Sequence, residues 1–189
     1  MGLALPSVRI IAMMDFSVSQ GLYLLLILAF VVERLIEVRV SNRNAQTSFA
    51  QGGVEYGKGH YPAMVVLHTL FLIACPLEVL WLNREFQPIV GGIALAVCVA
   101  TQLLRWWVIT TLGWRWNTRV IVVQGLAPIT EGPFRYLSHP NYLAVIVELI
   151  ALPMVHNAWS TAGIFTFLNA ILLSVRIPIE NQALGRKAG

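Results

Sequence analysis

Charged residues are scarce in this sequence. Only 12% of the 189 residues are Asp, Glu, Lys or Arg, whereas 57% are hydrophobic and the mean hydropathy is +0.71. A soluble domain ordinarily carries about 25% charged residues. The shortage argues against a soluble globular domain and predicts an integral membrane protein.

Cysteine is also nearly absent. Cys75 and Cys98 both lie within apolar runs, without a CxxC partner or the spacing of metal ligands. We therefore expect lipid-facing or packed thiols and no metal site. The net charge of +4 comes without a basic stripe interleaved with aromatic residues, so nucleic-acid binding is not expected.

Five apolar stretches are long enough to cross a bilayer, for which about 20 helical residues are needed. They comprise residues 16–35, 62–82, 88–112, 140–155 and 158–175. The last two are separated by a brief turn and are expected to form a helical hairpin. Residues 1–15 are too short and too lightly basic for a cleaved signal, so a weak interfacial segment is expected there. The predicted fold is an all-α integral membrane protein with about five transmembrane helices and a single domain over residues 1–189.

The basic residues predict the orientation of these helices. If the N-terminus is outside, eleven Lys and Arg residues fall on the cytoplasmic side and only Arg9 and Arg84 fall outside. This asymmetry predicts that the start of the fourth apolar run and the C-terminus face the cytoplasm. Irregular backbone at membrane depth is tolerated only where it is buried or lines a cavity. The two cytoplasmic segments, residues 41–61 and 113–139, are therefore expected to cover a site together with the C-terminus.

The stretch "EGPFRYLSHPNYL" precedes the fourth apolar run. Gly132 and Pro133 indicate a turn, and Pro140 suits the first position of a helix capped by Ser138 or His139. The free N–H groups of that helix start would stabilise an anionic group. The alternative is simply a capped membrane helix with interfacial tyrosines.

The stretch "RIPIEN" ends the fifth apolar run. Arg176 and Glu180 are four residues apart and share one helix face, and Pro178 between them is expected to perturb or end the span. A plain ion pair at the membrane boundary would explain them. The predicted hairpin, however, brings them to the same end as His139 and Tyr142.

Together, "GPFRYLSHPNYL" and "RIPIEN" resemble the paired motifs of the isoprenylcysteine carboxyl methyltransferase superfamily. In that superfamily a G-P-[FY]-R-Y-x-[RK]-H-P-x-Y block and an R-x-x-x-E-E element bind S-adenosylmethionine. The resemblance implies the same cofactor here, bound by the half of the chain from about residue 120 to 189. The cofactor-binding residues that it implies are Tyr136, His139, Pro140, Tyr142, Leu143, Arg176 and Glu180.

This sequence departs from the family pattern in two places: Ser138 stands where Arg or Lys is common, and Asn181 replaces the second Glu. The first half, "ERLIEVRVSNRNAQTSFAQGGVEYGKGHYP", resembles a bacterial branch associated with type III polyketide synthases. Members of that branch are thought to O-methylate alkylpyrones or alkylresorcinols. The resemblance implies a location in the bacterial inner membrane and a lipophilic small-molecule acceptor reached from the membrane lipids.

A hydroxyl acceptor must lose its proton during methylation, and a base or a nearby positive charge would help. The candidates are Glu148 as a base, Arg105 as a stabiliser of an oxyanion, and His60 as a proton acceptor. An ion pair between helices explains Glu148 and Arg105 equally well. Alternative acceptors are a prenylcysteine carboxylate and a phospholipid amine, and alternative functions are a nicotinamide-dependent reductase and a non-catalytic scaffold.

Overall fold

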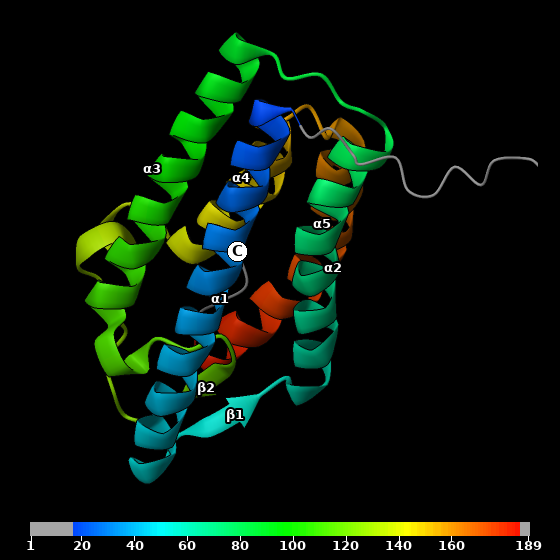
Figure 1. Cartoon of the computed structure of the whole chain (residues 1–189). Coiled ribbons are helices and arrows are strands. Elements are labelled where there is room, and N and C mark those ends of the chain that lie inside the picture. The colour runs from blue at the N-terminus through cyan, green and yellow to red at the C-terminus, as the bar shows by residue number, and fades with distance from the viewer. Residues whose placement is uncertain (1–16, 186–189) are drawn as a thin grey trace, which may run out of the picture.

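The computed structural model describes residues 17–185, so the predicted interfacial segment at residues 1–15 lies outside the described residues. Five long α-helices form a bundle, with α3 at one side and α1 in front of α4 (Figure 1). The helices are α1 (Val18–Ala50), α2 (Tyr61–Trp81), α3 (Pro88–Leu112), α4 (Pro140–Met154) and α5 (Trp159–Ala183). Each of the five apolar stretches of the sequence coincides with most of one helix.

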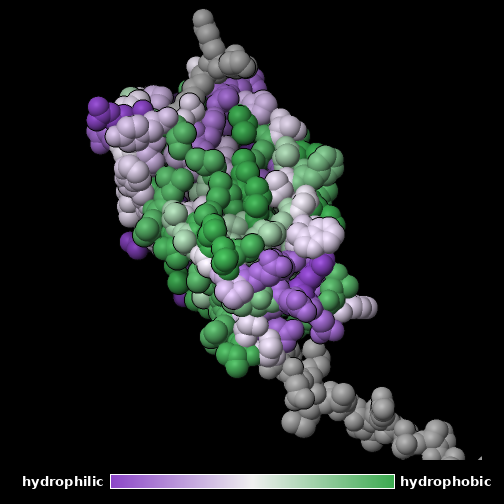
Figure 2. Space-filling view, turned by 90° about the horizontal axis from the view of Figure 1, so that it is seen from above, coloured by the Kyte–Doolittle hydropathy of each residue, from purple (hydrophilic) through white to green (hydrophobic). Residues whose placement is uncertain are grey.

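The bundle has the surface of a membrane protein. Three described segments are long and apolar enough to cross a bilayer, namely Lys58–Trp81, Pro88–Arg115 and Trp159–Ala183, and α4 is a shorter apolar helix. Large apolar side chains such as Leu70, Ile93 and Phe167 are exposed. Figure 2 shows such side chains across the middle of one face, with hydrophilic groups gathered around them. An apolar surface of this extent is unusual in water and suits a lipid environment.

Two helices are longer than predicted. Helix α1 continues through residues 41–50, which were expected to be irregular, and stops just before Gly52. This polar extension is held by tertiary contacts, because Asn44 Nδ2 donates to the Trp116 carbonyl at 2.8 Å. Helix α5 also continues past Pro178 to Ala183. A proline removes one helical hydrogen bond without ending the helix when neighbouring contacts hold the chain.

The two predicted cytoplasmic segments meet in a small antiparallel sheet. Strand β1 (Val54–Tyr56) pairs with β2 (Val120–Val122), so that Val54 faces Val122 and Tyr56 faces Val120. Three short 3-10 helices belong to the same segments, namely η1 (Lys58–His60), η2 (Gly113–Arg115) and η3 (Gly132–Arg135). The sheet lies at the end of the bundle where α1 ends and α2 begins (Figure 1). The predicted loops therefore form an ordered cover on this end.

A group of ionised side chains is buried between α1, α3 and α4. The Glu148 carboxylate accepts hydrogen bonds from Arg105 at 2.6 Å, Arg34 at 3.1 Å and Gln102 at 3.2 Å. Arg34 also donates to Glu37 at 2.5 Å. Arg34 and Glu37 both lie within α1. Buried charges must be paired, so this cluster fixes how three helices pack.

At the end of the bundle opposite the sheet, Glu78 of α2 caps the N-terminus of α5. Its carboxylate accepts hydrogen bonds from the backbone N–H groups of Ser160 at 3.2 Å and Thr161 at 2.6 Å. Arg84 donates to the same carboxylate at 2.8 Å. A carboxylate at a helix N-terminus satisfies free N–H groups and complements the helix dipole. Glu78 therefore locks the α2–α3 connection onto the start of α5.

Replacing Glu148 by Ala leaves the guanidinium groups of Arg34 and Arg105 without their shared carboxylate. We expect the free energy of unfolding to fall by about 3–5 kcal/mol, the range for breaking a buried ion pair by removing one partner. Thermal unfolding of the purified protein in detergent measures this. The control is Glu85→Ala, which removes an exposed carboxylate and should change stability by less than about 0.5 kcal/mol. A Glu148→Ala variant as stable as the control would contradict a structural role for the cluster.

Candidate functional site

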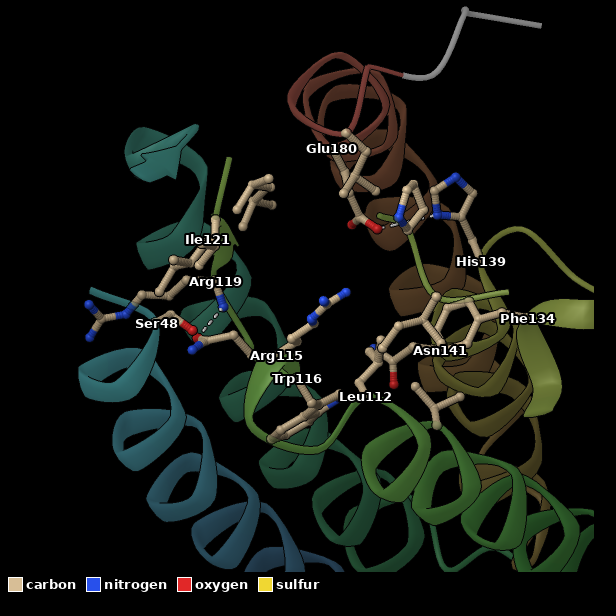
Figure 3. A pocket seen from close by; sticks show the side chains of 18 of the residues that line it. Ser48, Leu112, Arg115, Trp116, Arg119, Ile121, Phe134, His139, Asn141 and Glu180 are labelled. Carbon is tan, nitrogen blue, oxygen red and sulfur yellow. Dashed lines mark hydrogen bonds and ion pairs between the residues drawn. The ribbon is translucent and has the colours of Figure 1, made fainter. Parts of the chain in front are cut away.

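A cavity of about 170 Å³ opens at the end of the bundle that carries the sheet. It is bounded by the segment from η2 to β2, the loop that precedes η3, the start of α4 and the end of α5 (Figure 3). Side chains that line it include Leu112, Arg115, Trp116, Arg119, Phe134, His139, Asn141, Tyr142, Arg176 and Glu180. The two sequence motifs thus contribute to one cavity.

Tyr142 and Glu180 connect the two motifs directly. The Tyr142 hydroxyl donates a hydrogen bond to Glu180 Oε2, and Arg176 Nε donates to the same hydroxyl at 2.9 Å. Tyr142 lies in the first turn of α4, whereas the other two residues lie near the end of α5. The hairpin formed by α4 and α5 therefore aligns an arginine, a tyrosine and a carboxylate in one chain of hydrogen bonds.

The guanidinium of Arg176 is engaged almost fully by contacts within the protein. Its Nη2 donates to the Thr118 carbonyl at 2.6 Å and its Nη1 to Met64 Sδ at 3.2 Å, and His60 Nε2 lies 3.4 Å from Nη1. The side chain is 5% exposed. A guanidinium with these partners holds Tyr142 in place, so its role in the site is to position neighbouring groups.

The Thr118 carbonyl is itself held by α1. The Thr118 N–H donates to Ser41 Oγ at 3.0 Å, and Ser41 Oγ donates to Asn117 Oδ1 at 2.9 Å. Asn117 Nδ2 returns a hydrogen bond to the Ser41 carbonyl at 3.1 Å. The polar extension of α1 thereby fixes the segment that contacts Arg176.

His139 completes the contact between the motifs. Its ring stacks on Tyr142 with the centroids 5.3 Å apart. Its Nε2 lies 3.0 Å from Asn181 Oδ1, and its Nδ1 lies 3.5 Å from Glu180 Oε1. Both ring nitrogens thus face side-chain oxygens of α5. Asn181, which departs from the family pattern, accepts the hydrogen bond that orients this ring.

The Glu180 side chain remains partly accessible. Its side chain is 27% accessible, and Figure 3 shows the carboxylate directed into the cavity from the end of α5. A carboxylate offers more acceptor positions than the one that Tyr142 occupies. Glu180 can therefore bind donors of a ligand in the cavity.

Two of the residues implied to bind the cofactor do not line the cavity. Tyr136 is 72% exposed at the end of η3, and Leu143 is 41% exposed on α4. Successive residues of an α-helix are rotated by about 100° because a turn holds about 3.6 residues, so Leu143 points away when Tyr142 points inward. Pro140, by contrast, is buried at the start of α4 and lines the cavity.

The three candidate catalytic residues also lie outside the cavity wall. Glu148 and Arg105 are paired with each other at 2.6 Å within the bundle, two turns along α4 from Tyr142. His60 lies behind Arg176. Of the acidic side chains in the part of the chain that the structure describes, Glu180 is the one that lines the cavity.

Asn141 and Arg115 are among the lining residues that the sequence reasoning missed. Asn141 Oδ1 is buried at the cavity without a hydrogen-bond partner among the described residues. Arg115 reaches from η2 toward the middle of the cavity in Figure 3, and its Nη1 donates to the Ala127 carbonyl at 2.8 Å. Asn141 is the variable position of the H-P-x-Y pattern, which could have drawn attention to it. Arg115 ends the short helix η2, outside both motifs, where residue spacing gives no signal.

Comparisons with known proteins agree with this arrangement of motifs. Residues 94–186 match the isoprenylcysteine carboxyl methyltransferase (ICMT) family. The uncharacterized protein YpbQ of Bacillus subtilis is 39% identical over 163 residues, which cover 86% of this chain and 96% of that protein. An uncharacterized protein of Haemophilus influenzae is 28% identical over 152 residues, which cover 80% of this chain and 88% of the relative. No solved structure gives a significant match. The chain belongs to the isoprenylcysteine carboxyl methyltransferase family, a family of membrane methyltransferases.

Proposed function

We propose that this protein uses S-adenosylmethionine to O-methylate a lipophilic acceptor such as an alkylpyrone or an alkylresorcinol. The observation that carries the proposal is the hydrogen-bonded chain of Arg176, Tyr142 and Glu180 at a cavity where two apolar helices end. It joins the two motifs that resemble the cofactor-binding elements of the family. Membership of a methyltransferase family favours this activity over a nicotinamide-dependent reductase or a scaffold.

The proposed location is the bacterial inner membrane, with the cavity facing the cytoplasm. Seven basic residues of the described chain lie at the end of the bundle that holds the cavity, and Arg84 lies at the other end. The seven are Arg39, Arg43, Lys58, Arg115, Arg119, Arg135 and Arg176. The excess of positive charge on one side supports a cytoplasmic cavity, where a charged cofactor is available.

The lining residues fit S-adenosylmethionine. The open carboxylate of Glu180 can accept hydrogen bonds from ribose hydroxyl groups. Asn141 Oδ1, which has no hydrogen-bond partner within residues 17–185, can accept one from the ammonium group of the amino-acid portion. Backbone groups of residues 126–129, which also line the cavity, can pair with the adenine edge. When bound, the cofactor supplies an electrophilic methyl group on a positively charged sulfur.

The protein contributes orientation and exclusion of water. Methyl transfer is an in-line displacement, for which reacting atoms held about 3–3.5 Å apart supply much of the rate enhancement. Leu112, Trp116 and Phe134 give the cavity an apolar wall, which keeps water away from the reacting atoms. Arg176 holds Tyr142, and Tyr142 in turn holds Glu180. This arrangement keeps the carboxylate in place before the ligand arrives.

Replacing Glu180 by Gln should weaken cofactor binding. The amide keeps the shape of the side chain but loses the charge and one acceptor, so we expect the affinity for S-adenosylhomocysteine to fall about tenfold or more, as for a lost hydrogen bond to a charged group. Isothermal titration calorimetry of the purified protein in detergent measures it. The matched control is Glu131→Gln, an exposed carboxylate of the same end of the bundle, which should bind like the wild type. Equal affinity of the Glu180 variant would show that the cofactor binds elsewhere.

The acceptor is tested with membranes that contain the overproduced protein and S-adenosylmethionine labelled in the methyl group. Long-chain pyrones, long-chain resorcinols, prenylcysteines and phosphatidylethanolamine are offered separately. We expect labelled methyl ether from the pyrone or resorcinol and little label with Glu180→Gln membranes, because that variant holds the cofactor poorly. Label only in phosphatidylethanolamine, or only in prenylcysteine, would replace the proposed acceptor by one of the two alternatives.

A further inference from the structure

The exposed face of α1 changes from apolar to cationic within one helical turn. Large apolar side chains, among them Val32, are exposed along it from Val18 to Val38. At 1.5 Å per residue this stretch is about 30 Å long, which matches the hydrocarbon core of a bilayer. Arg39 and Arg43 follow directly on α1, and both are exposed. The two guanidinium groups therefore lie at the depth of the lipid headgroups.

Arg39 and Arg43 share one side of the helix. Residues four apart are rotated by only about 40° relative to each other, so the two side chains lie one turn apart above the exposed Leu35. The acid nearest to them in the sequence, Glu37, is buried and paired with Arg34. Among the described residues, neither of the two exposed guanidinium groups has an ion-pair partner. This face thus combines an apolar strip with two unpaired cations.

The opposite face of the same part of α1 holds the cover of the cavity. Ser41 lies between the two arginines in the sequence and is rotated by about 160° from each of them. Its hydroxyl accepts a hydrogen bond from the Thr118 N–H at 3.0 Å and donates to Asn117 Oδ1 at 2.9 Å. The Thr118 carbonyl in turn accepts from Arg176 at 2.6 Å. One short segment of α1 therefore connects a cationic outer surface with the hydrogen bonds that shape the cavity.

We propose that Arg39 and Arg43 bind the headgroup of an anionic phospholipid of the cytoplasmic leaflet, and that the bound lipid strengthens cofactor binding by stabilising the polar extension of α1. The inference rests on the proposed cofactor and goes beyond the proposed reaction, because it assigns a regulatory lipid site on the outer surface. The lipid must carry a net negative charge. A zwitterionic headgroup would bring an ammonium group close to two guanidinium groups, and like charges repel.

The polar extension of α1 has little apolar burial of its own. Its last turns project past the sheet in Figure 1, and its buried residues Ser41, Ala45 and Ser48 are small, so the hydrophobic contribution is small. A ligand that binds only the ordered helix shifts the equilibrium toward that state. Each cation at an anionic membrane surface contributes about a fivefold gain in binding, so two arginines limit the effect on the cavity to about thirtyfold.

The lipid site is tested in nanodiscs made of phosphatidylcholine alone or of an equal mixture of phosphatidylcholine and phosphatidylglycerol. We expect calorimetry to show an affinity for S-adenosylhomocysteine about fivefold higher in the mixture, at the lower end of typical allosteric coupling. The gain should shrink at high salt, because exposed charges are then screened. Equal affinity in the two nanodiscs at low salt would overturn the inference. A gain produced by inorganic phosphate in phosphatidylcholine nanodiscs would overturn the assignment to a lipid.

Substitution of the two arginines assigns the effect to this face. The double variant Arg39→Gln, Arg43→Gln should lose the response to phosphatidylglycerol, whereas replacing both by Lys should keep most of it, because the site requires charge. Both side chains are exposed, so folding should be unaffected. The matched control, Lys58→Gln with Arg135→Gln, removes two exposed cations from the same end of the bundle and should respond like the wild type. A response in the double Gln variant, or its loss in the control, would contradict the proposed site.

Hydrogen exchange of the Thr118 N–H tests the coupling without any cofactor. This N–H donates to Ser41 Oγ, so its exchange reports how often the cover separates from α1. Exchange in the wild type should be slower in the phosphatidylglycerol mixture than in phosphatidylcholine, and equal in both for the double Gln variant. Unchanged exchange in the wild type would overturn the coupling. Slower exchange without S-adenosylhomocysteine binding in either lipid would instead refute the proposed function and support the lipid site.

Discussion

The buried guanidinium of Arg176 is the constraint on which the cavity depends. It lies near the end of α5, 5% exposed, where a charge without partners would be strongly destabilising. Its donors reach the Tyr142 hydroxyl on α4, the Thr118 carbonyl before β2 and Met64 Sδ on α2. Because a guanidinium is planar and its N–H directions are fixed, satisfying it sets the relative positions of three elements. The orientation of Glu180 follows, since Tyr142 donates to that carboxylate.

The cover of the cavity is built from segments that are far apart in the sequence. Ser41 on the α1 extension binds both Asn117 and Thr118, and β1 pairs with β2 beside them. The Thr118 carbonyl can meet Arg176 only if this segment is held in place. The polar extension of α1 thus has a structural purpose at the site, although it contributes no lining side chain beyond Ser48.

The parts that could be predicted from the sequence are those that local rules determine. The length of the apolar stretches predicted the five helices. The hairpin of α4 and α5 brought the motifs together, because a short turn forces two helices to be antiparallel neighbours. The α1 extension lacks an apolar signal, since its contacts are polar and tertiary. Likewise, Arg115 is directed into the cavity from the short helix η2, which has no clear sequence signal. Leu143 follows Tyr142 in the motif but does not line the cavity, because neighbouring residues on a helix face different directions. Position within a motif therefore does not by itself place a side chain in the site.

The structure also separates two kinds of ionised residue within one membrane bundle. Arg34, Glu37, Arg105 and Glu148 are paired with one another between helices and do not line the cavity that holds the two motifs. Glu180 and Arg115 lie where apolar helices end, and each keeps hydrogen-bonding capacity directed into a cavity. An ionisable residue at membrane depth is by itself a hypothesis of function. The two sets of residues differ in whether each charged side chain is already paired with a side chain of opposite charge. By that criterion Glu148 stabilises the bundle, whereas Glu180 and Arg115 remain available to ligands.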